Sequence, residues 1–143
     1  MNRLESIPVP TEQPATNQDG GEDDVCRLCN AAWFKLILGA CKLGRGDHLI
    51  AAHLALEAAG DAIVLQMIRR DRDSGTQIHR YGQREPVPLL EALRDAPGDD
   101  AGGILWLLHT AGAQLDRQAA QLLPQYPPHL PGYARWTHQL GLD

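Results

Sequence analysis

The feature that most constrains this chain is a continuous stretch, residues 27–56, in which two apolar, helix-periodic segments flank one short turn. The turn reads Gly44-Arg45-Gly46-Asp47. Glycine is the usual residue in the left-handed position that ends a helix, and aspartate is a preferred N-cap because its side chain accepts a hydrogen bond from the following backbone amides. We therefore expect a first helix to stop at Gly44 and a second to begin after Asp47.

The rest of the chain also shows helical periodicity, and strand-like alternation is not sustained anywhere. The expected helices span about 24–43, 48–70, 88–94, 100–122 and 132–142. A polar segment rich in turn formers, 71–86, and a proline-rich segment, 124–131, separate them. The sequence thus predicts an all-α fold, a bundle of four to five helices.

Apolar and small residues recur on one face of each long helix, and we predict that these faces form the core. In the first helix they are Val25, Leu28, Ala32, Leu36, Gly39 and Leu43, widened by Trp33 and Ile37. In the second they are the small residues Ala51, Ala55, Ala58 and Ala62. In the fourth they are Ile104, Leu105, Leu108, Ala111, Leu115, Ala119 and Leu122. Four aromatic residues are interpreted as packing residues, with base-stacking or ligand-stacking platforms as the alternative: Trp33, Phe34, Trp106 and Trp136.

The N-terminal residues 1–24 differ from the rest in composition. They hold six acidic residues against one arginine, which accounts for the net charge of −5, whereas residues 25–143 are balanced. Three prolines and a lack of periodicity predict a disordered acidic tail or linker in front of a single helical domain, 25–143. With no secretion signal and no apolar run of about 18 residues, we expect a soluble, cytoplasmic protein without a membrane segment.

The three cysteines, Cys26, Cys29 and Cys41, are expected to be reduced structural thiols, with Cys29 on the apolar face and Cys26 at its margin. A Cys-x-x-Cys pair is also a zinc-binding pattern. Cys41, however, lies twelve residues beyond Cys29 on the same expected helix. At 1.5 Å per residue this separation is roughly 18 Å, too far for the three thiolates to bind one tetrahedral zinc ion. We therefore predict no metal site.

The order of several short motifs resembles the helical C-terminal domain of lincosamide- and streptomycin-type antibiotic adenylyltransferases. The first part of the resemblance is the Trp33-Phe34 pair, then Lys42, then the Arg45-Gly46-Asp47 turn leading into an Ala/Leu-rich helix. The second part is His79-Arg80-Tyr81-Gly82 with Arg84, followed by a short helix and a proline-rich segment. The likeness covers about residues 24–140 and implies an HEPN-like bundle, the class to which these helical domains belong.

The resemblance implies an accessory or substrate-binding domain of an antibiotic-resistance type of nucleotidyltransferase, with Lys42, His79, Arg80 and Tyr81 as candidate contacts to nucleotide or acceptor. Catalysis in that superfamily needs a Gly-Ser turn followed by paired acids that bind magnesium. Neither serine of this chain follows a glycine. The pair Asp71 and Asp73 is interpreted as part of a solvated loop. The chain alone is therefore expected to be non-catalytic and without cofactors, and ATP and Mg²⁺ would enter only with a separate nucleotidyltransferase subunit.

A second interpretation is a metal-independent HEPN-type ribonuclease toxin, silenced by a nucleotidyltransferase antitoxin. Such enzymes carry an arginine, four to six residues and then a histidine, which Arg72 and His79 match. Histidine would serve as general acid or base, and arginine would stabilise phosphate charge. This interpretation implies RNA as substrate and a symmetric homodimer. The surrounding arginines are either a phosphate-binding or nucleic-acid-binding patch or an ordinary exposed loop: Arg69, Arg70, Arg72, Arg80 and Arg84.

A third interpretation is a non-enzymatic helical protein that binds another protein. His53, Glu57 and Asp61 recur every fourth residue and so share one face of the second helix. They form either a carboxylate–imidazole group or, as we favour, a solvated or partner-facing interface surface. A docked nucleotidyltransferase subunit would place this face at the cleft between the two chains, where ligands often bind.

Overall fold

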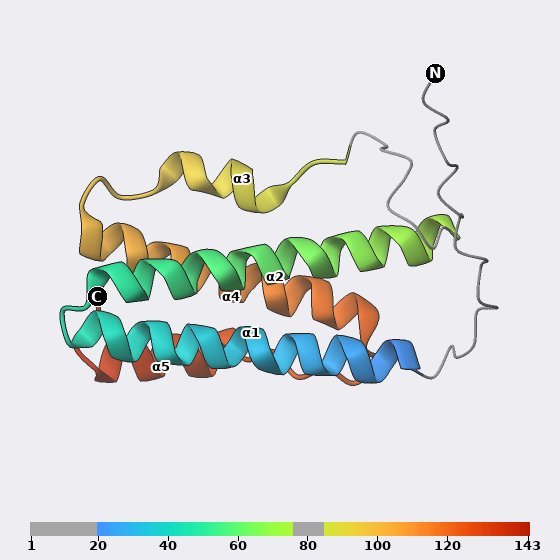
Figure 1. Ribbon diagram of the computed structural model, residues 1–143, viewed down its shortest axis with the longest axis horizontal. Helices are drawn as coiled ribbons and strands as arrows, with labels where there is room; N and C mark the ends of the chain where they lie inside the picture. Colours follow the sequence, from blue (N-terminus) through green and yellow to red (C-terminus); the bar gives the residue numbers. More distant parts are fainter. Residues whose placement is uncertain (1–19, 76–84) are drawn as a thin grey trace, which may run out of the picture.

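The computed structural model describes residues 20–75 and 85–143, and within these ranges the protein is all helical, without a strand (Figure 1). The elements are α1 (Gly20–Gly44), α2 (His48–Ser74), α3 (Pro88–Ala92), a 3₁₀ helix η1 (Leu93–Asp95), α4 (Asp100–Leu122) and α5 (Leu130–Gln139). The all-α prediction is confirmed.

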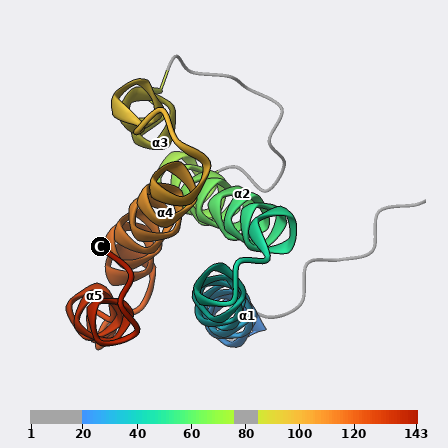
Figure 2. The ribbon, with the colours of Figure 1, turned by 90° about the vertical axis from the view of Figure 1, so that its left-hand side faces the viewer.

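Three long helices, α1, α2 and α4, pack against one another and form the core of the bundle. The end-on view shows α5 beside α4 on the same side as α1, whereas α3 lies at the opposite side (Figure 2). The faces predicted for α2 and α4 are the ones that the structure buries. All four alanines of the α2 stripe and all seven apolar residues predicted for α4 are buried.

Gly39 of α1 shows how closely these helices approach. A Cβ atom built at this position would lie 2.8 Å from Cδ2 of Leu108 in α4 and 3.5 Å from Cβ of Leu54 in α2. The first of these distances is shorter than real carbon contacts allow. Any larger residue at the point where α1, α2 and α4 meet would therefore force the Leu108 side chain to shift.

Two helices extend beyond their predicted limits. Helix α1 begins at Gly20 rather than near residue 24, and α2 continues to Ser74 rather than ending near residue 70. The expected loop at 71–86 is wrong in its first residues, because polarity alone does not stop a helix when i,i+4 ion pairs support it. Arg69 pairs with Asp73 at 2.8 Å, and Gly75 then ends α2 with a left-handed φ of 65°.

The turn between α1 and α2 differs from the prediction in one detail. Gly46, with φ of 79°, is the left-handed residue, whereas Gly44 is still helical. The predicted cap is present, since the Asp47 carboxylate accepts a hydrogen bond from the backbone amide of Ile50 at 3.4 Å. At the other end of the chain, α5 begins at Leu130, inside the segment predicted as a break, because Pro131 sits in its first turn, where proline is tolerated.

The apolar face of α1 is narrower than its sequence suggests. Phe34 is 65% exposed and Ile37 is 44% exposed, so neither is the core residue that was predicted. Trp33 is buried, while Trp106 and Trp136 are half-buried. The reason is that only α2, α4 and α5 are available to cover α1, and the side of the helix that bears Phe34 has no neighbour among the described residues.

Helix α2 meets the length and composition criteria for crossing a membrane, with an 18-residue window of mean hydropathy 1.4. No other helix among the described residues meets them. Core helices of soluble proteins pass the same test, and 33% of this window is buried inside the bundle. Solubility and a cytoplasmic location therefore stay predictions.

Candidate functional site

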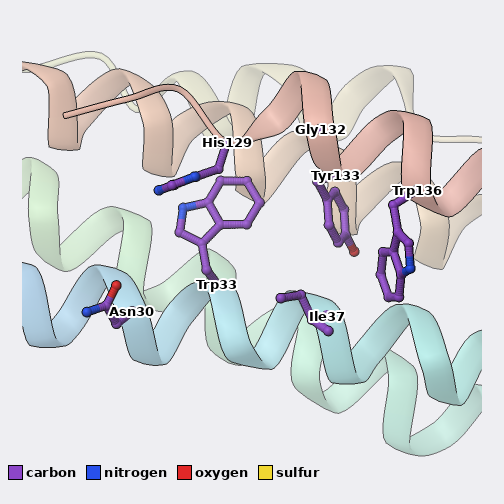
Figure 3. Close-up of a pocket in the computed structure, with 7 residues that line it drawn as sticks. All are labelled: Asn30, Trp33, Ile37, His129, Gly132, Tyr133 and Trp136. Carbon is purple, nitrogen blue, oxygen red and sulfur yellow. The ribbon is translucent and has the colours of Figure 1, made fainter.

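A cleft of about 480 Å³ lies between α1 and α5 (Figure 3). The side chains around it are mainly aromatic and apolar. They are Asn30, Trp33 and Ile37 from α1, and His129, Gly132, Tyr133 and Trp136 from α5 and the residue that precedes it. Clefts of about 300–1,000 Å³ with such a lining are typical small-molecule sites.

Asp116 of α4 positions the start of α5, which forms one wall of the cleft. Its carboxylate accepts hydrogen bonds from the backbone amides of His129 at 3.0 Å and Leu130 at 2.8 Å. The residue at the N-cap position, His129, makes no side-chain cap hydrogen bond of its own. The first amides of a helix lack intrahelical acceptors, so the carboxylate of Asp116 replaces the missing cap from a neighbouring helix.

Trp33 is central to an aromatic cluster beside the cleft. Its ring meets the rings of His129 and Tyr133 edge-on, with centroid distances of 5.4 Å and 5.6 Å. Its Nε1 donates a hydrogen bond to the Tyr126 hydroxyl at 2.8 Å, and that hydroxyl donates to Asp116 at 2.8 Å. These contacts hold the cleft in shape without a ligand, since every ring is fixed by at least one partner.

The two tyrosines of the cluster act as neutral hydrogen-bond donors. Tyr133 is buried and donates its hydroxyl proton to the backbone carbonyl of Leu36 at 2.8 Å. Burial raises the pKa of Tyr133 and of Tyr126, and the Asp116 carboxylate raises the pKa of Tyr126 further. Both phenols therefore keep their protons around neutral pH and contribute apolar surface rather than charge.

His109 joins α4 to α5 behind the cleft. Thr137 donates its only hydroxyl proton to the carbonyl of Ala134 at 3.0 Å, so its oxygen must accept from His109 Nε2, 2.9 Å away. Burial lowers the pKa of His109. The imidazole is therefore neutral with its proton on Nε2, and it serves to attach α5.

Three polar groups of the cleft remain free for a ligand. Within the described part of the chain, the Asn30 amide, the ring nitrogens of His129 and the indole N–H of Trp136 make no hydrogen bond. Asn30 and His129 lie at one end of the cleft, and Trp136 lies at the other (Figure 3). The cleft thus offers an apolar middle between two polar ends.

Of the residues expected to contact nucleotide or acceptor, only Lys42 lies in the described part of the chain, and it does not line this cleft. Lys42 is half-buried near the C-terminal end of α1, with Nζ 3.8 Å from Oδ2 of Asp47. His79, Arg80 and Tyr81 lie outside the described residues, as does Arg84. Arg72 of the ribonuclease interpretation lies in the last turn of α2, where it donates a hydrogen bond to the carbonyl of Leu122 at 3.3 Å. Because α1 and α2 run in opposite directions, Lys42 and Arg72 are at opposite ends of the bundle (Figure 1).

The expected interface stripe on α2 divides in two. His53 and Glu57 are exposed and lie 3.6 Å apart. Asp61 instead turns toward α1 and forms an ion pair with Lys35 at 2.7 Å. The solvated or partner-facing surface therefore comprises His53 and Glu57, while Asp61 links the two helices.

The arginines at the end of α2 are held by carboxylates and amides of the bundle. Arg69 pairs with Asp73 and Glu85 and donates to Gln118 Oε1 at 3.0 Å. Arg70 lies 3.7 Å from the carboxylate of Asp71. Neighbouring carboxylates thus partly compensate the positive charge of Arg69 and Arg70, which argues against a phosphate-binding patch at these two arginines.

The cysteines differ in environment more than was predicted. Cys29 is buried, and burial raises the pKa of its thiol to about 11. Cys41 is half-buried, but Cys26 is exposed rather than structural, because it points away from the core-facing side of α1. Among residues 20–75 and 85–143, no three His, Cys, Asp or Glu side chains are grouped in a way that could hold a metal ion.

Sequence reasoning missed most of the cleft. Tyr126 and His129 fall in the segment predicted only as a break, and Trp33 and Trp136 were interpreted as packing residues. The available signal was the density of aromatic rings near the C-terminus, where Tyr133 and Trp136 are spaced i,i+3 and so share a helix face. That α1 supplies the opposite wall follows only from the tertiary fold.

The fold and the cleft together define a helical bundle with a mainly apolar cleft between α1 and α5. Comparison of the chain with protein-family models, curated proteins and solved structures finds no match.

Proposed function

We propose that this chain is a small-molecule-binding helical domain, an accessory domain comparable to the HEPN-like C-terminal half of antibiotic adenylyltransferases. The observation that carries the proposal is the aromatic cleft between α1 and α5, with its volume of about 480 Å³. The order of motifs along α1 and α2 supports the family comparison. In this role the chain binds an acceptor molecule, and a separate nucleotidyltransferase subunit supplies ATP, Mg²⁺ and the catalytic carboxylates.

The shape of the cleft supports binding rather than plain packing. Trp33, Tyr126 and Asp116 form a continuous hydrogen-bonded chain from α1 to α4, so the walls do not depend on a ligand for their position. Trp136 remains half-buried with its indole N–H free among the described residues. Preorganised sites bind more tightly because the side chains lose little freedom on binding.

The test is a binding screen of antibiotic-sized molecules, with neutral aromatic compounds as well as lincosamides and aminoglycosides, followed by tryptophan fluorescence. Trp33 and Trp136 line the cleft, so a bound molecule should change emission. The blocking variant is Gly132→Leu, because an added Cβ at Gly132 meets no atom within 4 Å and the side chain would occupy the cleft. The proposal is supported if the wild-type protein binds a molecule saturably and the Gly132→Leu variant does not. If no molecule binds, or if the Gly132→Leu variant binds with the same affinity as wild type, the cleft is not a ligand site.

A second candidate is an interaction protein, and the exposed face of α2 favours it. Leu49 is 84% exposed, Leu56 is 61% exposed and Val64 is 41% exposed. Together with Gly60 they recur at helical spacing on the side opposite the buried alanines. Exposed apolar residues that share one helix face are a common feature of association surfaces.

The simplest partner for this face of α2 is a second copy of the chain, and self-association can be measured directly. Light scattering during size-exclusion chromatography, at two protein concentrations, should show a dimer that Leu49→Gln with Leu56→Gln converts to monomer. Both residues are exposed, so the double variant should keep the core intact. A wild-type protein that stays monomeric at both concentrations would contradict self-association through α2.

A further inference from the structure

The lining of the α1/α5 cleft restricts the chemical class of ligand, an inference that rests on the proposed binding function. None of the seven residues that line the cleft in the described part of the chain is an aspartate, glutamate, lysine or arginine. The carboxylate of Asp116, which contacts the backbone of the lining residue His129, already accepts hydrogen bonds from Tyr126, His129 and Leu130. We propose that the cleft binds an uncharged, flat organic molecule that carries a hydrogen-bonding group at one or both ends.

The middle of the cleft offers only apolar surface. The indole N–H of Trp33 and the hydroxyl of Tyr133 are each satisfied inside the protein, by Tyr126 and by the Leu36 carbonyl. Ile37, which is 44% exposed, completes this part of the lining. A ligand at this point gains dispersion and hydrophobic contact but no hydrogen bond, which favours a ring system over a sugar or a peptide backbone.

The two polar ends set the length of the ligand. Asn30 and His129 provide an amide and an imidazole at one end, and Trp136 provides an N–H donor at the other (Figure 3). On α1 the cleft extends from Asn30 to Ile37, a rise of roughly 10 Å at 1.5 Å per residue. Two or three fused rings with a terminal hydroxyl or amide match this distance.

A charged ligand fits poorly for a physical reason. An ammonium, carboxylate or phosphate group that enters the cleft would lose hydration without gaining an opposite charge, which is costly. Cation–π attraction does not compensate, because Trp33 and Tyr133 are 8% and 6% exposed and their rings pack edge-on against each other. Trp136 is half-buried, and its ring packs against that of Tyr133 at a centroid distance of 5.9 Å. The lining therefore disfavours the triphosphate of a nucleotide in this cleft.

The experiment compares three probes that share one ring system and differ in charge: 2-naphthylmethanol, 2-naphthylmethylamine and 2-naphthoate. Each is titrated into ¹⁵N-labelled full-length protein, and the indole N–H signals of Trp33, Trp106 and Trp136 are followed by NMR. We expect the neutral alcohol to bind at least tenfold more tightly than either charged analogue and to shift the Trp136 signal most. The Trp106 signal, from a residue that does not line the cleft, serves as an internal reference.

Two leucine variants separate the possible results. Gly132→Leu fills the cleft, and Gly44→Leu makes the same change at an open position at the end of α1 outside it. Loss of alcohol binding in Gly132→Leu alone supports the inference. If the amine or the carboxylate binds as tightly as the alcohol and Gly132→Leu abolishes both, the proposed charge preference is wrong while the binding function stands. If Gly132→Leu changes nothing, the cleft is not the site and both proposals fall.

Discussion

The indole nitrogen of Trp33 donates a 2.8 Å hydrogen bond to the hydroxyl of Tyr126, a residue 93 positions later in the chain. The same hydroxyl donates to the carboxylate of Asp116 at 2.8 Å. One phenol oxygen therefore joins α1, α4 and the segment that leads into α5. Because Asp116 also holds the first amides of α5, this short chain of hydrogen bonds fixes both walls of the cleft.

Replacement of Tyr126 by phenylalanine should destabilise the protein. The change keeps the ring but leaves the partly buried Trp33 N–H without its acceptor and removes one donor to Asp116. We expect a loss of about 1–3 kcal/mol in the free energy of unfolding, measured by urea denaturation. Tyr133→Phe, which removes a single hydrogen bond to the Leu36 carbonyl, is the comparison variant and should cost less. A Tyr126→Phe protein as stable as wild type would show that the network contributes nothing.

The protein should lose stability in mild acid, in part through His109. Burial places the pKa of His109 below its ordinary value of 6.5. The unfolded chain then takes up this proton at a higher pH than the folded protein, so stability falls as the pH drops below 6.5 toward the folded pKa. His109→Gln cannot titrate, and its unfolding free energy should depend less steeply on pH between 7 and 5. Parallel pH profiles for the two proteins would contradict this assignment.

The two helical glycines Gly39 and Gly60 should respond in opposite ways to alanine. Gly39→Ala forces a methyl group toward Leu108, which is fully buried and has little room to move. Overpacking of this kind costs about 1–3 kcal/mol, which we expect to exceed the helix-propensity gain of about 1 kcal/mol. The methyl group added in Gly60→Ala meets no atom within 4 Å, so this variant should keep the helix-propensity gain and be more stable than wild type. Chemical denaturation of both variants tests the prediction, and a stabilised Gly39→Ala protein would refute the close approach of α1 to α4.

The cysteines should differ in reactivity. Cys26 is exposed, whereas the buried thiol of Cys29, with a pKa of about 11, carries almost no thiolate at neutral pH. Iodoacetamide applied to the native protein should therefore modify Cys26 well before Cys29, as peptide mass spectrometry can show. In denaturant the difference should disappear. Equal labelling of both cysteines in the native state would contradict the burial of Cys29.

The elevated pKa of Cys29 also has a consequence at high pH. The unfolded thiol loses its proton near 9.0, while the folded thiol keeps it until about 11. Between these values the unfolded state binds fewer protons than the folded state, so stability should fall as the pH rises. Cys29→Ser, which does not titrate in this range, should show a shallower decline in denaturation experiments than wild type does.

The structure confirms most of the helices that the pattern predicts, and the errors have two origins, one local and one tertiary. The spacing of Ile104, Leu108 and Leu115 identified the buried face of α4 because hydrophobic periodicity is a local property of the chain. The C-terminal end of α2 was placed too early because the Arg69–Asp73 pair stabilises a polar helical turn. The Cys26 and Phe34 side chains were assigned to packing, yet they are exposed, since a sequence does not state how much of a helix its neighbours cover.

The sequence by itself determined that this chain forms a helical bundle, which faces of α2 and α4 are buried, and that Asp47 begins α2, because periodicity and capping act over a few residues. Only the tertiary structure decided that Trp33 and Trp136, 103 positions apart, line opposite walls of one cleft. Only the tertiary structure also decided that the Asp116 carboxylate, from α4, accepts the hydrogen bond that caps the start of α5. Such contacts depend on how α5 docks on α1 and α4, and that docking results from long-range packing that leaves no periodic trace in the chain.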